Sequence, residues 1–267
     1  MQVPGVSKGI NTKGSFNYLY LLVFILIAFL VGLIGYSFFL YNKRIMSGEK
    51  RKELSTIADL KADQITQWRK DCIVDASAIY ANAMIAHRFI DYFNGKETSL
   101  ALEEFRTWLT SLHDIAGYSR AVITRPNGEI VVSVPDDHHL MTNHCLNMTT
   151  EAARRQEVIF SDFHRDDPSG HIHLNLIIPI KHTVGKHSKT IAVLSLEMDP
   201  HTFLYPLIRS WPTQSKTAET LLVERDGNDV LFLNNLRFRE NTALSLRYCW
   251  WRVLYFPLIP RSPQRRQ

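Results

Sequence analysis

The sequence has few cysteines, and none of them are close together. Its 267 residues include only three, Cys72, Cys145 and Cys249, with no CxxC pair. This count and spacing exclude a disulfide-rich scaffold and a cysteine zinc finger.

Catalytic signatures are absent as well. The sequence contains no GxSxG, no GxxxxGK[ST] and no GxGxxG, and it lacks the glycine-rich ATP-binding elements of a kinase. Cys145 follows His144, but neighbouring residues of a helix point about 100° apart, so the two do not form a thiol–base pair. We therefore expect a protein that is not an enzyme, with no catalytic residue and no cofactor.

Acidic residues are missing from the last 19 positions, which hold four arginines at positions 252, 261, 265 and 266. The rest of the chain carries 27 basic and 26 acidic side chains, so the net charge of +5 arises almost entirely from this tail. A folded part this close to neutral does not indicate nucleic-acid binding.

Charge is also absent from residues 14–42, and within them residues 18–41 form one apolar run. At 1.5 Å per residue these 24 residues span about 36 Å as a helix, enough to cross a hydrocarbon core of about 30 Å. The apolar region of a cleaved signal peptide is shorter, about 7–15 residues. We predict an uncleaved transmembrane helix over residues 18–41 in the lipid bilayer.

Basic residues flank this run unequally. Lys8 and Lys13 precede it, whereas five positive residues follow it between positions 43 and 52. Positive charge alone favours a cytoplasmic C-terminal side, but long domains are translocated largely regardless of charge. The charge pattern therefore leaves the orientation open.

A helical pattern follows the apolar run. Eleven positions spaced by three or four residues form one stripe, and ten of them are apolar: 54, 57, 61, 65, 68, 72, 76, 79, 83, 86 and 90. No proline or glycine interrupts residues 49–94, which predicts one stalk helix that ends near Asn94 and Gly95. The stripe could pair with a second copy, giving a homodimer, or pack as an ordinary core helix.

Shorter elements follow, and they predict an α+β module with a five-stranded antiparallel sheet. The helices are expected at residues 100–116, 144–156 and 199–207. The strands are expected at residues 120–124, 129–134, 158–161, 171–180 and 190–196, with a hairpin turn at Pro126-Asn127-Gly128. The stalk and this module together occupy residues 45–214.

A second module begins after Trp211-Pro212 and is incomplete. Residues 215–248 supply one hairpin, around Asp226-Gly227, and residues 249–267 form an irregular basic tail with three prolines. A two-stranded hairpin is marginal in water. We expect residues 217–267 to be poorly ordered or loosely packed.

At this point the residues resemble a known family. A stalk helix carrying Ile65, Gln67, Trp68 and Arg69, and the segments EMDP (197–200), FLYPL (203–207) and TAETLLV (217–223), are similar to the double Cache region of bacterial transmembrane receptors. That region is a PAS-like sensor found in sensor histidine kinases and diguanylate cyclases. The resemblance implies a single-pass protein of the inner membrane, with residues 1–17 in the cytoplasm and a periplasmic part that binds a small ligand.

The chain departs from this family in two respects. It contains neither a second membrane helix nor an output domain, and it lacks the Tyr, Arg and Trp-Tyr pattern of Cache domains that bind amino acids. The resemblance therefore names no ligand and suggests a truncated receptor. Two alternatives stay open: a non-signalling remnant of a sensor kinase or cyclase, and a structural membrane-anchored protein.

In a PAS-like module the sheet and its covering helices enclose a small-molecule site. Arg120, at the start of a strand, suits a carboxylate ligand through a bidentate pair. The aromatic and charged residues expected to border the site are Trp108, Tyr118, Arg120, Asp162, His164, Arg165 and His173.

Histidines gather in the same region, with nine of the eleven between His138 and His201. His171 and His173 share one face of a predicted strand, and together with nearby carboxylates they suit zinc. The alternative is a polar strand edge with scattered surface histidines. There is no HExxH motif, and we expect no metal site.

Overall fold

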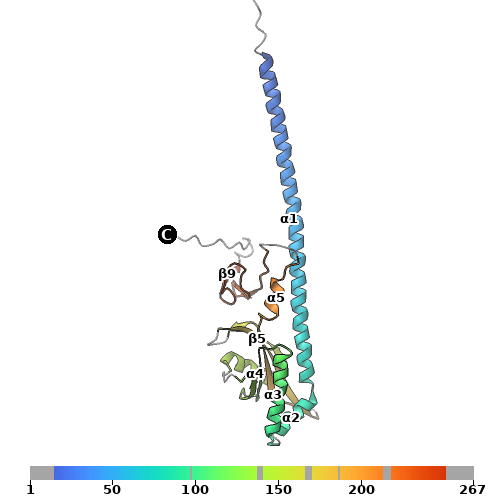
Figure 1. Cartoon of the computed structure of the whole chain (residues 1–267), viewed down its shortest axis with the longest axis vertical. Helices are drawn as coiled ribbons and strands as arrows, with labels where there is room; N and C mark the ends of the chain where they lie inside the picture. Colours follow the sequence, from blue (N-terminus) through green and yellow to red (C-terminus); the bar gives the residue numbers. More distant parts are fainter. Residues whose placement is uncertain are drawn as a thin grey trace, which may run out of the picture. The chain divides into compact units, whose positions relative to one another are not determined.

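The computed structural model describes residues 15–96, 98–136, 141–165, 170–185, 187–212 and 218–250. The chain divides into two compact parts, Met1–Asp59 and Leu60–Gln267. Helix α1 (Ser15–Tyr80) begins in the first part and ends in the second (Figure 1).

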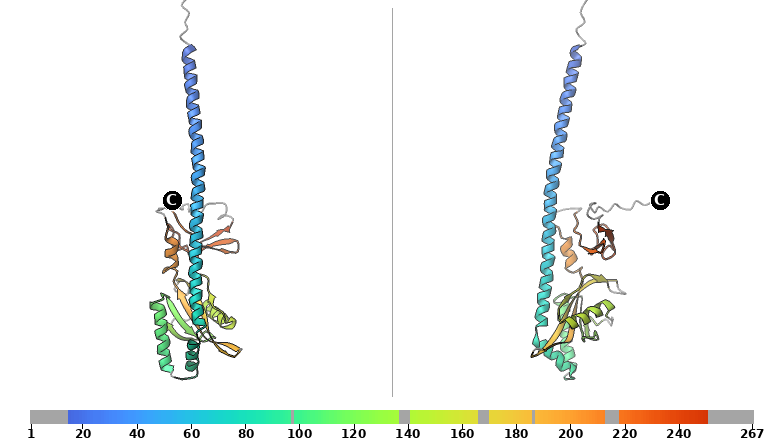
Figure 2. Two further views of the ribbon diagram at one scale, coloured as in Figure 1. Left: turned by 90° about the vertical axis from the view of Figure 1, so that its right-hand side faces the viewer. Right: turned by 180° about the vertical axis from the view of Figure 1, so that it is seen from behind.

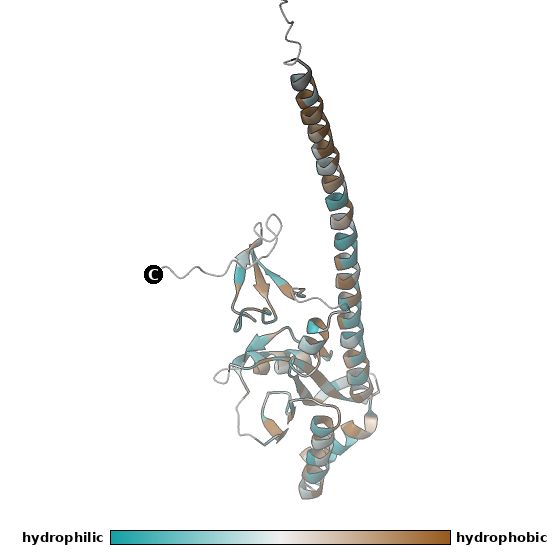
Figure 3. Ribbon diagram, turned by 45° about the horizontal axis from the view of Figure 1, so that its top comes forward, coloured by the Kyte–Doolittle hydropathy of each residue, from teal (hydrophilic) through white to brown (hydrophobic). Residues whose placement is uncertain are grey.

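The first part consists of the N-terminal portion of α1. Every residue from 18 to 41 is exposed, and the apolar run is the brown stretch of the helix in Figure 3. Among the described helices, α1 alone is long and apolar enough to cross a membrane. The predicted membrane helix and the predicted stalk are thus one continuous helix of 66 residues.

The prediction of an unbroken helix to residue 94 is wrong at Ala81 and Asn82. Helix α2 (Ala83–Phe93) starts afresh there, because the Asn82 side chain accepts hydrogen bonds from the backbone N–H groups of Met84 and Ile85. An asparagine that caps backbone donors in this way competes with helix continuation. The second helix ends at Asn94, as predicted.

The second part is built on an antiparallel sheet, which confirms the predicted α+β class. Its strands lie in the order β2-β1-β6-β5-β3, and β4 pairs with β5 beside β3. The short β4 was not expected. The bounds are β1 (Arg120–Thr124), β2 (Ile130–Val134), β3 (Ile159–Phe160), β4 (His164–Arg165), β5 (Ile172–Val184) and β6 (His187–Met198).

Two hairpins join neighbouring strands. The long β5–β6 hairpin, seen from two sides in Figure 2, turns at Gly185, where Val184 faces His187. The β1–β2 hairpin turns at the predicted Pro126-Asn127-Gly128. Gly128 has φ +88°, a conformation that residues with a Cβ rarely adopt, and its N–H donates to the carbonyl of Arg125.

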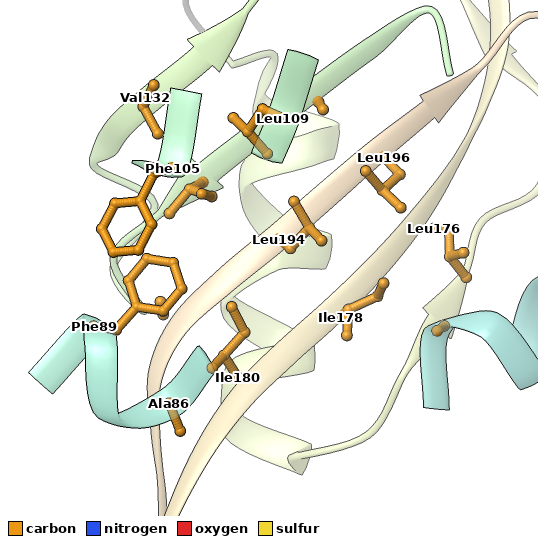
Figure 4. Close-up of a cluster of buried hydrophobic side chains, with 14 of the residues drawn as sticks. Ala86, Phe89, Phe105, Leu109, Val132, Leu176, Ile178, Ile180, Leu194 and Leu196 are labelled. Atoms are coloured by element: carbon orange, nitrogen blue, oxygen red, sulfur yellow. The ribbon is translucent and has the colours of Figure 1, made fainter. Parts of the chain in front are cut away.

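The two faces of the sheet have different chemistry, because side chains alternate along each strand. The main core lies on the face covered by α1, α2 and α3 (Thr98–Asp114), and its central side chains are drawn in Figure 4. From β5 and β6 it takes Leu174, Leu176, Ile178, Ile180, Ala192, Leu194, Leu196 and Met198. Helix α4 (Asn143–Arg155) covers the other face, where Ala152 packs on Ile177 and Val193.

The stripe on α1 meets this core. Cys72 and Ala76 are buried in it, and Trp68 and Ile79 pack against it. The packed-helix interpretation therefore holds for this stretch. Homodimer formation remains a prediction for the N-terminal end of the stripe, where Leu54 is exposed.

After the sheet comes α5 (Leu204–Arg209), followed by a separate sheet of β7 (Val223–Asp226), β8 (Asp229–Phe232) and β9 (Arg247–Cys249). The third strand corrects the expected two-stranded hairpin. Val230 and Phe232 are buried, and Cys249 belongs to β9 and not to an irregular tail. Residues 251–267 of that tail lie outside the described residues.

The connection between β8 and β9 is hydrogen-bonded to the first module, where we expected loose packing. The hydroxyl of Tyr205 on α5 donates to the carbonyl of Leu233, at 2.6 Å. The Arg165 guanidinium donates to the carbonyl of Ala243, at 2.5 Å, and to Ser245 Oγ, at 3.2 Å. Side chains from β4 and from α5 therefore bind the connection between β8 and β9 at two separate places.

Candidate functional site

A cavity of about 380 Å³ opens beside the C-terminal half of α1. Helix α1 contributes four of its residues, and the connection before β1 and the connection after β6 supply most of the others. The lining residues are Trp68, Asp71, Cys72, Asp75, Ala116, Gly117, Tyr118, Leu174, Met198, Asp199, Pro200, Thr202, Phe203 and Leu204.

All charged residues that line the cavity are acidic. It contains three carboxylates, those of Asp71, Asp75 and Asp199, and no lysine, arginine or histidine. Gln67 donates to Asp71 and the backbone N–H of His201 donates to Asp199, whereas Asp75 makes no hydrogen bond or ion pair with the described residues. The charged part of the cavity lining is therefore acidic.

Titrating side chains in the wall reflect the same environment. Burial, reinforced by the charges of Asp75 and Asp71, raises the pKa of the Cys72 thiol to about 11. Burial is also the main cause that raises the pKa of Tyr118 to about 12, with a smaller contribution from the Asp75 charge. Both side chains therefore stay neutral at physiological pH, and the negative charge of the cavity resides on its aspartates.

Aromatic rings form part of the rim. Trp68 stacks on Phe203 with ring centroids 5.6 Å apart, and Phe203 is 46% exposed. Carboxylates next to the faces of aromatic rings suit organic cations, which gain from both charge attraction and the ring quadrupole.

The structure separates the seven residues predicted to border one pocket, so that prediction needs correction. Tyr118 lines the cavity, and Trp108 packs against the main core. Asp162 is exposed, and Arg165 binds the C-terminal sheet. The remaining three, Arg120, His164 and His173, lie together on the α4 face of the sheet, away from the main core.

Polar side chains form a row on that face. Arg120 pairs in register with Glu197, and Glu197 with Asn175, so the three stand side by side on β1, β6 and β5. His173 and Asn175 are each 2% exposed, and His173 Nδ1 lies 3.9 Å from Glu197 Oε1. Within this row His173 and Asn175 are buried, whereas Arg120 and Glu197 are half-buried.

Next to the row, Cys145, His164 and His173 converge. One nitrogen or sulfur atom from each lies within 4.8 Å of the others. His164 and His173 are direct cross-strand partners of β4 and β5, with ring centroids 4.2 Å apart. Cys145 approaches from the first turn of α4, with its Sγ 3.8 Å from His164 Nε2.

Sequence reasoning missed Cys145. We compared it only with the adjacent His144, whereas its partner in space is 19 residues away on an unexpected strand. No spacing motif links the three positions, because they belong to a helix and two strands that meet only through the tertiary fold.

The same cluster is poorly arranged for thiol–imidazole catalysis. Asn175 Nδ2 lies 3.1 Å from His164 Nε2, the nitrogen that Cys145 Sγ also faces, and His164 Nδ1 lies 3.0 Å from the carbonyl of Asp162. In a nucleophile–base–orienter triad the orienting group bonds the ring nitrogen opposite the nucleophile, and here the Asp162 carbonyl takes that position. The amide of Asn175, however, donates to His164 Nε2 and so occupies the lone pair that would have to accept the thiol proton.

The chain matches no protein-family model and none of the curated proteins searched. Two solved structures are similar in part. The sensor domain of the V. cholerae histidine kinase DctB matches with 11% identity and a TM-score of 0.35, over 57% of this chain and 61% of that one.

The second is the extracellular domain of vpHK1S-Z8, described as a histidine kinase. It matches with 10% identity and a TM-score of 0.28, over 69% of this chain and 92% of that one. At identities and TM-scores this low, the two matches establish neither a shared fold nor a shared function.

Proposed function

We propose that this protein is a membrane-anchored sensor whose module at residues 60–250 binds a small ligand in the cavity beside α1. The observation that carries the proposal is that α1 itself lines the cavity, through Trp68, Asp71, Cys72 and Asp75, and also bears the exposed apolar run. A ligand in the cavity therefore contacts the helix that would enter the membrane. The resemblance to Cache sensor regions supports the same role.

The chemistry of the lining favours a positively charged organic ligand, such as an amine. Three carboxylates and the stacked Trp68–Phe203 pair would bind a cation, whereas no basic lining residue is available for a carboxylate or phosphate. This differs from the anionic ligand that Arg120 suggested, because Arg120 lies on the α4 face and outside this cavity.

Signal transfer requires that the ligand prefers one of two states. The cavity wall combines α1 with the segment from Met198 to Leu204, which leads directly into α5. A ligand that draws Asp75 and Asp199 toward a common positive charge would shift the α5 connection relative to α1. The ligand would stabilise one arrangement over the other only by the difference between its affinities for the two arrangements.

The proposal places the protein in the inner membrane as a single-pass protein, with residues after 41 in the periplasm. Fusing alkaline phosphatase or green fluorescent protein after Gln267 tests this topology. Activity of the phosphatase alone is expected, because it requires export. Fluorescence alone would place the module in the cytoplasm and overturn this part of the proposal.

Ligand binding is tested with the full chain purified in detergent. Thermal unfolding is followed with a panel of organic amines and, in parallel, a panel of carboxylates, since a ligand that binds the native state raises the unfolding temperature. Amines are expected to stabilise and carboxylates to have no effect. Stabilisation by carboxylates alone, or by neither panel, would overturn the cationic-ligand assignment.

A matched pair of variants locates the site. Asp75→Asn removes one cavity charge and should weaken amine binding about fivefold, the equivalent of ~1 kcal/mol for a partly exposed ion pair. Asp63→Asn makes the same change at an exposed position of α1 that does not line the cavity, and should leave affinity unchanged. Equal affinity of both variants would show that amines bind elsewhere.

A further inference from the structure

We propose that Cys145, His164 and His173 form a binding site for a thiophilic transition-metal ion, Zn²⁺ or Cu⁺. The site lies on the α4 face of the sheet and shares no residue with the cavity beside α1. It is therefore independent of the ligand proposal, and it replaces the expectation that the chain has no metal site.

The ligand set fits this class of ion. One thiolate and two imidazoles suit zinc and copper, whereas magnesium and calcium prefer sets of oxygen ligands. No carboxylate belongs to the converging trio. The three side chains also come from three different elements, so the fold and not a local turn brings them together.

The distances are close to those of a bound ion. Zn–S and Zn–N bonds of about 2.3 and 2.0 Å at a tetrahedral centre place sulfur and nitrogen about 3.5 Å apart. Cys145 Sγ and His164 Nε2 are 3.8 Å apart, and the whole trio lies within 4.8 Å. To reach the tetrahedral spacing, the widest separation of donor atoms would have to shorten by up to about 1.3 Å.

The surroundings of the two histidines support the assignment. A metal-bound histidine usually donates its other ring N–H to a carbonyl or carboxylate. His164 Nδ1 faces the carbonyl of Asp162 at 3.0 Å, which fixes the ring so that Nε2 can bind the ion in place of its present contact with the Asn175 amide at 3.1 Å. His173 Nδ1 lies 3.9 Å from Glu197 Oε1, beyond hydrogen-bond distance, so the carboxylate supports this histidine by its charge alone.

The thiolate is supported as well. Asn175 Nδ2 lies 3.2 Å from Cys145 Sγ, close enough to donate a hydrogen bond to a sulfur ligand. Cys145 also lies in the first turn of α4, whose N-terminus is capped by the Thr142 hydroxyl, and the positive end of a helix dipole favours an anion. On binding, the thiol proton is released to solvent as the sulfur–metal bond forms.

Three protein ligands leave one position of a tetrahedral ion open. Such a site suits exchangeable binding more than a permanent structural role, in which four protein ligands close the coordination sphere. When occupied, the ion would link α4 to β4 and β5 across the face of the sheet. A metal ion would thus be a second ligand that this module can bind.

The test uses the full chain in detergent, without a histidine tag, kept reduced and stripped of metal with a chelator. Zn²⁺ is titrated in competition with a chromophoric chelator, and Co²⁺ is added as a spectroscopic probe. We expect one ion per chain, with a thiolate-to-cobalt charge-transfer band and four-coordinate d–d bands. Cu⁺ is titrated separately under anaerobic conditions with a Cu⁺-specific chelator.

Variants assign the ligands. Cys145→Ser should abolish the charge-transfer band and weaken Zn²⁺ binding by more than about 100-fold, since loss of an outer-shell partner alone costs 10–100-fold. Cys249→Ser, the matched control at an exposed cysteine of β9, should bind like the parent. Glu197→Gln should weaken binding about 10–100-fold while keeping the band.

His164→Gln provides a second ligand variant at a half-buried position, in case the change at Cys145 impairs folding. The proposal is overturned if the parent binds neither Zn²⁺ nor Cu⁺ stoichiometrically, or if Cys145→Ser and His164→Gln both fold and retain parental affinity. Amine stabilisation measured on the same samples reports on the cavity alone, so failure of one proposal is distinguishable from failure of the other.

Discussion

The hydroxyl of Tyr205 offers a direct test of whether the C-terminal sheet is an integral part of the fold. Tyr205 is 2% exposed, and its hydroxyl donates to the Leu233 carbonyl at 2.6 Å. Leu233 itself is 7% exposed. Tyr205→Phe removes the donor but keeps the ring, which stacks on Phe163.

The size of the effect follows from what remains. The ring still fills its place, so the loss is limited to one hydrogen bond and the desolvation of the buried carbonyl, about 1–2 kcal/mol. That free energy increases the population in which the C-terminal sheet is detached by about 5–30-fold.

Limited trypsin digestion of the full chain in detergent measures this population. Cleavage tracks the open population when opening and closing are fast relative to cutting, which low protease concentrations ensure. Sites at Arg225, Arg237 and Arg247 should be cut slowly in the parent and about 5–30-fold faster in Tyr205→Phe. Cutting at Arg154, on α4, should not change.

Tyr248→Phe is the matched control. Tyr248 lies on β9, its ring contacts Phe232, and its hydroxyl makes no hydrogen bond with the described residues. Its cleavage rates should equal those of the parent. Rapid cutting of the parent within residues 218–247, or identical rates for Tyr205→Phe and the parent, would refute the reasoning and restore the view of a loosely packed segment.

Alkaline pH gives the same bond a second readout. Burial raises the pKa of Tyr205 to about 12, so the folded state keeps the phenol proton where the unfolded state, with a pKa near 10, has lost it. The stabilisation is therefore complete below pH 10 and is lost as pH rises to 12, a change on the order of 2 kcal/mol. In Tyr205→Phe, stability should fall less steeply across this range.

Three further predictions concern stability, measured by chemical unfolding of the full chain. Lys61 is 6% exposed, and its ammonium donates to the carbonyl of Leu207 at 2.5 Å and to Ser210 Oγ at 2.7 Å, so Lys61→Met should cost about 1–3 kcal/mol. Because burial lowers the pKa of Lys61, the free energy of unfolding of the parent should rise relative to that of Lys61→Met as pH rises toward 10.5. A difference in unfolding free energy that stays constant with pH would contradict the assignment. Phe89→Ala should cost about 3–5 kcal/mol, since Phe89 is fully buried and stacks on Phe105 at 4.2 Å; a loss below about 1 kcal/mol would mean the cluster is loosely packed. Gly128→Ala should cost more than about 1 kcal/mol, because φ is +88° and the added Cβ would overlap Leu146, whereas Gly185→Ala, with open space around it, isolates the backbone contribution.

Local signals in the sequence predicted the elements well. The Pro-Asn-Gly turn located β1, β2 and their hairpin, and the helices predicted at residues 100–116 and 144–156 match α3 and α4 within two residues of their observed bounds. These signals work because side-chain periodicity and turn chemistry are encoded within about ten residues of sequence. The helix break at Asn82 was not predicted because an asparagine does not interrupt helical periodicity.

The candidate sites could not be predicted in the same way. They depend on which strands are neighbours, and β1 lies between β2 and β6 although β6 is more than 60 residues further along the chain. His164 and His173 were predicted to border a ligand site, but only the pairing of β4 with β5 places them opposite each other and next to Cys145. The acidic cavity was not predicted because its carboxylates come from α1 and from the end of β6, which meet only in the folded module.

The position of β1 between β2 and β6 has a consequence for how the module is made. Strand β1 is complete at Thr124, but its partner β6 ends at Met198, so the chain must be synthesised for about 74 more residues before that pairing can close. At 5–20 residues per second this delay is about 4–15 s. During it, Ala121, Ile123 and Val132 on the β1–β2 hairpin have no sheet to complete their core. Protection of this segment by chaperones should therefore matter more for the yield of folded protein than the rapid closure of the β5–β6 hairpin.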